Sequence, residues 1–117
     1  MSGAVSHYAG LAAEDIVARH YESLGFAEIK RRWRGPGGEV DLIVATQDQT
    51  VFVEVKQSRN FASAVAHVSA RQLQRVESSA AGYMAQLPAG QISEARIDVA
   101  LVDAQGHIEI IENATQC

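Results

Sequence analysis

Two runs decide the fold: Gly38-Glu39-Val40-Asp41-Leu42-Ile43-Val44 and Thr50-Val51-Phe52-Val53-Glu54-Val55-Lys56. Both are rich in β-branched residues, and the polar linker Gln47-Asp48-Gln49 separates them. Short β-rich runs joined by a polar connection are typical of an antiparallel hairpin. We therefore expect these two runs to form neighbouring antiparallel strands.

Charged residues interrupt these otherwise apolar strands. Side chains alternate along a strand, so Glu54 and Lys56 are expected on the same face as Phe52 and opposite to the neighbouring valines. In the first strand, Glu39, Asp41 and Ile43 are expected to alternate with Val40, Leu42 and Val44. The side chains of Asp41, Glu54 and Lys56 are therefore expected to converge near one end of the sheet.

The totals limit the class of protein. A chain of 117 residues predicts one domain, 1–117, and 47% hydrophobic with 21% charged residues is typical of a soluble globular protein. A net charge of −4 argues against a uniformly basic coat for nucleic acid. The single cysteine, Cys117, excludes an intramolecular disulfide. With no secretory signal or membrane span visible, the pattern favours a cytoplasmic protein without membrane contact.

The rest of the chain adds two helices and three strands. Residues 1–7 carry no pattern and are expected to form a flexible end. The predicted elements are a helix at about 8–24, a strand at 26–33, a helix at about 70–87, a buried strand at 95–102 and a short strand at 107–111. The second helix lies between strands three and four, which suits a parallel crossover. This order predicts an α/β fold with a mixed sheet and helices packed against it.

The strand at 26–33 ends in a basic cluster, Lys30, Arg31, Arg32, Trp33 and Arg34. Cations with an aromatic ring among them can bind a phosphate backbone and stack on a base. Charge on an exposed edge strand also protects that strand from aggregation. The sequence leaves both interpretations open. Alternation predicts that Arg31 and Trp33 share a face opposite to Lys30 and Arg32.

The two strand carboxylates suggest a metal site. Asp41 and Glu54 are hard oxygen donors, suited to Mg²⁺ or Mn²⁺. Lys56 could then orient a water or stabilise a phosphate, Glu14 could be a further ligand, and Gln72 could position the water or the phosphate. The simpler interpretations are a surface ion pair for Glu54 and Lys56 or a salt bridge to Asp41, a strand-end cap for Asp41 and a solvated helix carboxylate for Glu14.

These motifs resemble the PD-(D/E)xK nuclease signature. The segments Gly-Glu-Val-Asp-Leu-Ile at 38–43 and Phe-Val-Glu-Val-Lys at 52–56 carry the resemblance, together with Ala-Ala-Glu-Asp at 12–15 and Ile-Asp-Val-Ala at 97–100. More narrowly, the chain is similar to the YraN-like family of predicted endonucleases, related to Holliday-junction resolvases and restriction endonucleases. That similarity implies an αβββαβ core.

The resemblance also implies roles for five residues. It implies metal ligation by Asp41 and Glu54, catalysis by Lys56, a supporting acid at Glu14 and a polar helix residue near the site at Gln72. We therefore expect a Mg²⁺- or Mn²⁺-dependent endonuclease acting on DNA, including branched or otherwise structured DNA, with a homodimer as a further expectation. The alternatives are a non-catalytic nucleic-acid-binding module and a protein-interaction domain on the same scaffold.

Overall fold

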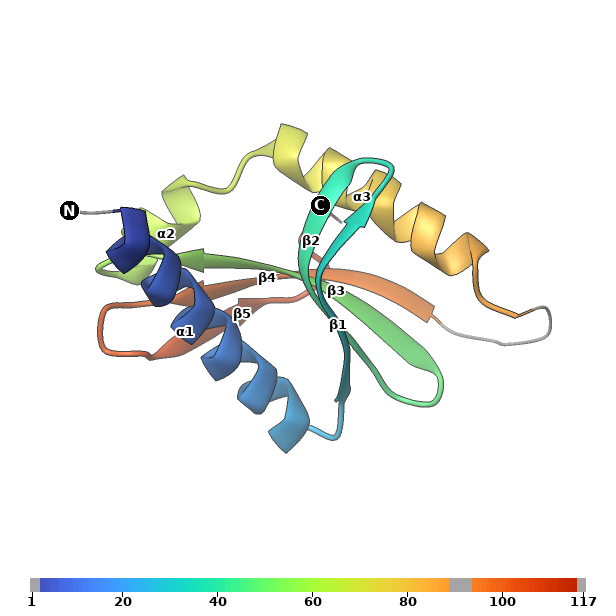
Figure 1. Ribbon diagram of the computed structural model, residues 1–117, viewed down its shortest axis with the longest axis horizontal. Helices are drawn as coiled ribbons and strands as arrows, with labels where there is room; N and C mark the ends of the chain where they lie inside the picture. The colour runs from blue at the N-terminus through green and yellow to red at the C-terminus, as the bar shows by residue number, and fades with distance from the viewer. Residues whose placement is uncertain (1–2, 89–93, 116–117) are drawn as a thin grey trace.

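The structure is a computed structural model that describes residues 3–88 and 94–115, with side chains described from residue 12 onward. Its elements follow the predicted order with one additional helix (Figure 1). They are α1 (Gly3–Ser23), β1 (Ala27–Gly35), β2 (Gly38–Ala45), β3 (Gln49–Gln57), α2 (Phe61–Ala66), α3 (Ala70–Ala85), β4 (Glu94–Val102) and β5 (Ile108–Ile111).

The first helix is longer than predicted. It begins at Gly3, so residues 3–7 belong to it rather than preceding it. Its buried stripe is Ala13, Val17, Ala18 and Tyr21, whereas Leu24, expected in that stripe, lies after the helix with 59% of its surface exposed. Residues 1–2, most of the loop expected at 88–93, and Cys117 lie outside the described residues.

The additional helix α2 lies in a segment for which no helix or strand was predicted. Asn60 caps it, because the Asn60 side chain accepts a hydrogen bond from the Ser63 N–H at 2.8 Å. Six residues are too few for a helical hydrophobic pattern to repeat, so only the capping asparagine marks the helix in the sequence.

The five strands form one mixed sheet in the order β1-β2-β3-β4-β5. Only the β3–β4 pair is parallel, and α2 and α3 form the crossover between these two strands. Figure 1 shows α1 on one side of the sheet and α2 and α3 on the other. The predicted α/β fold with a mixed sheet flanked by helices is confirmed, and it is compatible with a restriction-endonuclease-like core.

Alternation in β3 is as predicted. Val51 and Val53 pack with α1, and Val55 packs at the margin of the same cluster. Phe52 points the other way, into the cluster that contains Val76 of α3. Glu54 and Lys56 therefore follow Phe52 onto the face covered by α2 and α3.

Alternation in β1 and β2 breaks midway, so two predictions fail. Val40 was expected opposite to Ile43, but both pack in the α3-side cluster. Arg31 and Trp33 were expected on one face, but Arg31 contacts Asp15 of α1 whereas Trp33 packs on the α3 side. In β1 the break lies between Arg31 and Trp33, at Arg32, which has a left-handed backbone with φ 52°, and the same strand contains a register shift between residues 28 and 30.

This break sends the tip of the β1–β2 hairpin across α3, as Figure 1 shows. The Gly37 N–H donates to Ser79 Oγ at 3.0 Å, and Ser79 Oγ donates to the Gly38 carbonyl at 2.8 Å. The approach is so close that a Cβ at Gly37 would lie 2.0 Å from the carbonyl oxygen of Arg75. Glycine is therefore required at 37, and the tip fixes α3 relative to the sheet.

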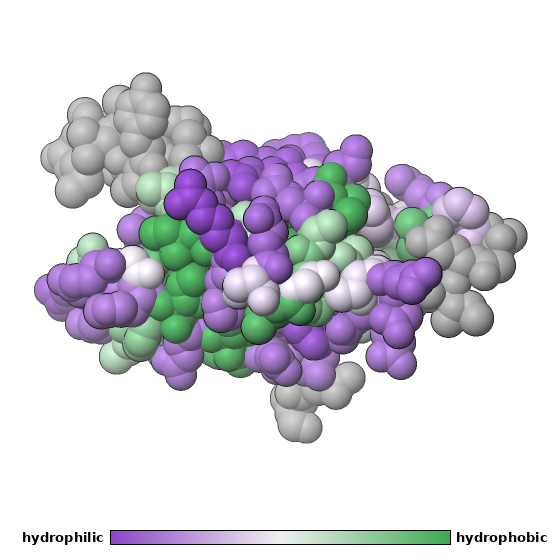
Figure 2. Space-filling view, turned by 90° about the horizontal axis from the view of Figure 1, so that it is seen from below, coloured by the Kyte–Doolittle hydropathy of each residue, from purple (hydrophilic) through white to green (hydrophobic). Residues whose placement is uncertain are grey.

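The surface is mostly polar, with apolar areas between polar side chains on the face shown in Figure 2. Among the described residues the large exposed apolar side chains are Leu24, Ile29 and Val65. None of the described helices combines the length and the hydrophobicity needed to cross a membrane.

Candidate functional site

Asp41 lies where β2 turns away from β3. The β2–β3 ladder runs as far as the pair Leu42 and Val53, and one step further Asp41 comes opposite Glu54. There Asp41 Oδ2 accepts a hydrogen bond from the Val55 N–H at 2.8 Å, in place of a carbonyl of the partner strand. The expected strand-end cap is thus present, and it holds the carboxylate of Asp41 next to the strand that carries Glu54.

Glu54 is buried, with 4% of its surface exposed. Its Oε2 accepts a hydrogen bond from Gln72 Nε2 of α3 at 2.9 Å. Its Oε1 is buried and has no hydrogen-bond partner among the described residues. A buried oxygen of this kind costs roughly 1–3 kcal/mol unless a ligand satisfies it.

A second buried carboxylate, Asp98 of β4, provides a comparison. It accepts hydrogen bonds from the Tyr21 hydroxyl at 2.7 Å, from Arg96 at 2.9 and 3.0 Å, and from the Asn113 N–H at 3.2 Å. Asp98 is therefore neutralised and fully satisfied, as a structural acid should be. Glu54 lacks both an ion-pair partner and a full set of donors among the described residues.

The pKa values of Asp41 and Glu54, which together form the acid pair of the site, reflect the shortage of positive charge around Glu54. Burial and, to a smaller extent, the nearby charge of Asp41 raise the pKa of Glu54 to about 7, against the opposing effects of Lys56, the Asp41 N–H and Gln72. Burial also raises the pKa of Asp41, against the hydrogen bond from Val55. Asp41 thus lies close enough to Glu54 to destabilise the ionised form of Glu54.

Lys56 lies on the same face of β3 as Glu54 and is partly buried. Its positive charge opposes the rise in the pKa of Asp41 and Glu54, so Lys56 lies within electrostatic range of both carboxylates. Within the described part of the chain, its ammonium group forms no hydrogen bond or salt bridge. The structure thus brings Asp41, Glu54 and Lys56 together, and the surface ion pair suggested for Glu54 and Lys56 is not formed.

Gln72 reaches the site from the first turn of α3. Ser69 is the N-cap of α3, and its Oγ accepts a hydrogen bond from the Gln72 N–H at 3.1 Å. The Gln72 side chain points to Glu54 instead of returning to Ser69. The capping residue therefore sets the start of α3 at the point from which Gln72 meets Glu54.

Glu54 and Gln72 border a pocket of about 150 Å³ between the hairpin tip and α3. Its lining residues are Gly37, Gly38, Glu39, Glu54, Gln72, Arg75 and Val76. A larger cavity of about 260 Å³ lies between α3 and the start of β4, but it contains neither Asp41 nor Glu54. The smaller pocket therefore contains Glu54 and Gln72, whereas Asp41 and Lys56 are not among its lining residues.

Glu14 lies beside the site but is already paired. Its two carboxylate oxygens accept hydrogen bonds from Arg32 Nε and Nη2 at 3.1 and 3.0 Å. Its charge nevertheless raises the pKa of Asp41. Glu14 is thus a buried helix carboxylate near the site, and metal ligation by it stays a prediction.

The predicted basic cluster does not act as one surface. Arg31 forms ion pairs with Asp15 and Glu28, and Arg32 is paired with Glu14. The ring of Trp33 packs edge-on against Tyr83 with centroids 5.4 Å apart. Lys30 and Arg34 are exposed. Base stacking by Trp33 stays a prediction, although its ring already contributes to the core.

The donor set fits a hard cation that retains part of its water shell. Within residues 3–88 and 94–115 no group of three or more histidine, cysteine, aspartate or glutamate side chains could hold a metal ion. Mg²⁺ is commonly bound through only one or two carboxylates, together with waters and substrate phosphates. Asp41 and Glu54, with its unpartnered Oε1, are two carboxylates that could hold such an ion.

Sequence reasoning missed two residues of this site. Arg75 lines the pocket. The sequence could have identified it as a site residue, because it follows Gln72 by three residues and both therefore lie near one helix face. Ser79 holds the hairpin tip, but its contacts lie 41 and 42 residues away in the sequence, and no local pattern predicts them.

Comparison with known proteins places the chain in a family. The model of the uncharacterised protein family UPF0102 matches residues 13–102. A UPF0102 protein of Ruegeria pomeroyi is 52% identical over 112 residues, covering 96% of this chain and 91% of the relative. A UPF0102 protein of Cereibacter sphaeroides is 50% identical over 114 residues, covering 97% of each. One from Dinoroseobacter shibae is 41% identical over 106 residues, covering 91% and 79%. This chain belongs to the UPF0102 family.

Proposed function

We propose that this protein is a Mg²⁺- or Mn²⁺-dependent endonuclease that hydrolyses phosphodiester bonds in DNA. The observation that carries the proposal is the buried Glu54 carboxylate, whose Oε1 has no partner among the described residues and which lies beside Asp41 and Lys56. The resemblance to PD-(D/E)xK nucleases and to the YraN-like family agrees with this arrangement. A bound Mg²⁺ would neutralise charge on a phosphodiester and lower the pKa of a water.

Each residue has a defined task in this proposal. Asp41 and Glu54 would hold the ion, and Gln72 would fix the Glu54 carboxylate through its amide. Lys56, an ammonium group with no salt bridge to a described residue, would orient the attacking water or stabilise negative charge on the phosphate. Glu14 would keep Arg32 in place beside Asp41, and it would have to release Arg32 before it could bind the ion directly.

The pocket reaches the hairpin tip and the exposed side of α3, so a chain of phosphates has access from that side. Branched or structured DNA is the substrate class that the resemblance suggests. A homodimer would present two such sites to two strands, and the cytoplasm is the compartment where we expect the protein to act.

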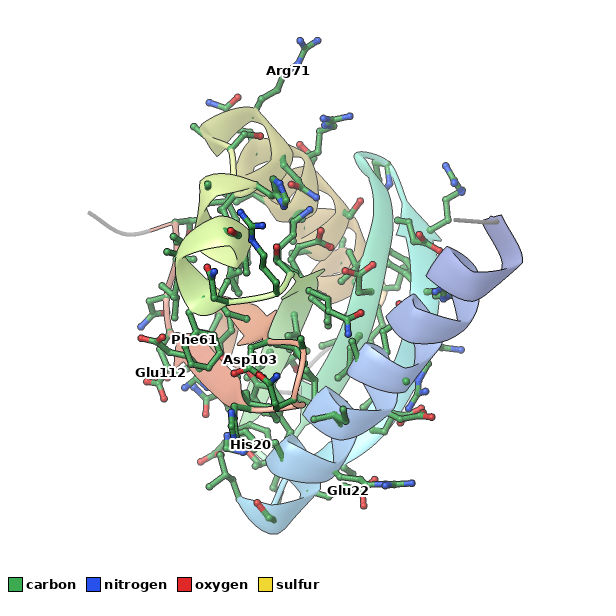
Figure 3. All side chains as sticks on the ribbon, turned by 90° about the vertical axis from the view of Figure 1, so that its left-hand side faces the viewer. His20, Glu22, Phe61, Arg71, Asp103 and Glu112 are labelled. Carbon is green, nitrogen blue, oxygen red and sulfur yellow. The ribbon has the colours of Figure 1, made fainter. Side chains whose placement is uncertain are left out.

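A cleavage screen tests the proposal. Single-stranded, duplex, flap and four-way-junction DNA would be incubated with the protein and Mg²⁺ or Mn²⁺. We expect cleavage by the wild type and loss of cleavage in Glu54→Gln and Lys56→Gln. Glu22→Gln is the matched control, because Glu22 is exposed at the end of α1, far from α3 in Figure 3.

Binding of Mn²⁺ provides a second readout that does not depend on the substrate. Calorimetric titration should detect Mn²⁺ binding to the wild type and to Lys56→Gln, but not to Glu54→Gln. Equal cleavage by all variants would contradict the assignment of the site. DNA binding without metal-stimulated cleavage on any substrate would favour the non-catalytic module, and absence of DNA binding at low salt would favour the protein-interaction domain.

A further inference from the structure

The exposed side of α3 carries two arginines with no acidic partner. The side chains of Arg71 and Arg75 are both exposed, and neither guanidinium group forms a salt bridge or hydrogen bond with a described residue. They are four residues apart, so they lie on one helix face about one turn apart, a rise of about 6 Å. In Figure 3 the side chain of Arg71 extends away from α3 into solvent.

This placement is unfavourable for the helix by itself. Arg71 is the second residue of α3, and the first turn contains no acid. The positive end of the helix dipole lies there, so a cation in that turn is repelled and a carboxylate would be preferred. Two like charges four residues apart also repel each other. The two guanidinium groups on this helix face thus have no acidic partner among the described residues.

The same face leads into the pocket that contains Glu54. Arg75 lines that pocket together with Gln72, and its carbonyl oxygen lies under Gly37 of the hairpin tip. The hydrogen bonds from Gly37 to Ser79 and from Ser79 to Gly38 fix the tip on α3. Arg75 is therefore at the mouth of the pocket on a fixed helix, and Arg71 lies one turn further out.

The basic cluster of β1 is arranged differently. The guanidinium group of Arg31 forms salt bridges with Asp15 and Glu28, and that of Arg32 forms one with Glu14. A phosphate would have to displace these carboxylates before it could bind either arginine. The arginines of α3 require no such displacement.

We propose that Arg71 and Arg75 bind successive backbone phosphates of the DNA strand that enters the pocket, with Arg75 next to the phosphate at the acid pair. This inference rests on the proposed function and specifies how its substrate is held. It assigns the main phosphate contacts to the first two turns of α3, beside the pocket, rather than to the paired Arg31 and Arg32.

The salt dependence of DNA binding tests the assignment separately from cleavage. Binding of a fluorescent DNA duplex would be measured at several salt concentrations in Ca²⁺, a hard cation chosen to occupy the acid pair. Each lost phosphate contact should reduce the slope of log Kobs against log[salt] by about 0.9 for duplex DNA. We expect a reduction of about 0.9 for Arg75→Gln and about 1.8 for the double variant Arg71→Gln/Arg75→Gln.

The controls distinguish the possible results. Arg19→Gln, an exposed arginine of α1, should leave the slope unchanged. An unchanged slope in the α3 double variant, with a reduced slope in Lys30→Gln/Arg34→Gln, would overturn this inference while cleavage by the wild type still upheld the proposed function. If the wild type neither binds nor cleaves DNA, both fail. Circular dichroism of each variant would establish that the fold is retained.

Discussion

Replacing Glu54 with glutamine should stabilise the metal-free protein at neutral and alkaline pH. Glu54 has 4% of its surface exposed, and burial raises its pKa from 4.5 to about 7. The folded protein therefore holds this proton more tightly than the unfolded chain. Stability is highest when Glu54 is protonated, and it falls as pH rises from the unfolded pKa to the folded pKa.

The size of the effect follows from the shift. One pKa unit corresponds to about 1.4 kcal/mol, so a shift from 4.5 to about 7 gives about 3 kcal/mol. Below about pH 4.5 the wild type and Glu54→Gln should have similar free energies of unfolding. Above about pH 7 the variant should be more stable by about 3 kcal/mol, because the amide has no charge to bury and its oxygen can still accept the hydrogen bond from Gln72.

Urea denaturation at a series of pH values in EDTA measures this difference directly. Comparing the two proteins at each pH cancels the titration of all other groups, and the exposed Glu22→Gln provides a control that should follow the wild type. Added Mg²⁺ should stabilise the wild type and not the variant. The reasoning is refuted if Glu54→Gln is less stable than the wild type at alkaline pH, or if the difference does not change with pH.

Three further predictions concern the surroundings of the site. Arg32→Gln should lower the free energy of unfolding by about 2 kcal/mol, because it leaves Glu14 buried without its cation, and Glu14→Gln in the same chain should restore part of the loss in urea titrations. Gly37→Ala should destabilise the protein by more than about 2 kcal/mol, since the new Cβ would meet the carbonyl of Arg75 at 2.0 Å, and a normal melting temperature would contradict this. Asp41→Asn should keep the fold, because an amide oxygen can still cap β3, but should weaken Mn²⁺ binding at least tenfold by calorimetry.

The sequence by itself determined most of the helices and strands and the candidate residues of the site. The β-branched runs at 38–44 and 50–56 predicted the hairpin, the alternation in β3 placed Glu54 and Lys56 on one face, and the helix between strands three and four predicted the parallel crossover. These features depend on periodicity and on connection lengths, which are local properties of the chain. The candidate residues Asp41, Glu54 and Lys56 could be chosen for the same reason, since they interrupt a pattern.

Only the tertiary structure decided how these residues are partnered. The contact of Gln72 with Glu54 spans 18 residues and the contacts of Ser79 with the hairpin tip span 41 and 42 residues, and such distances leave no local pattern. Alternation failed where a left-handed backbone at Arg32 and a register shift in β1 moved side chains to the other face. Pairing between charges also depends on which elements meet in space. The sequence does not show which of the charged residues Glu14, Arg32 and Arg75 are paired. In the structure Glu14 and Arg32 form a salt bridge, whereas Arg75 lies at the mouth of the pocket.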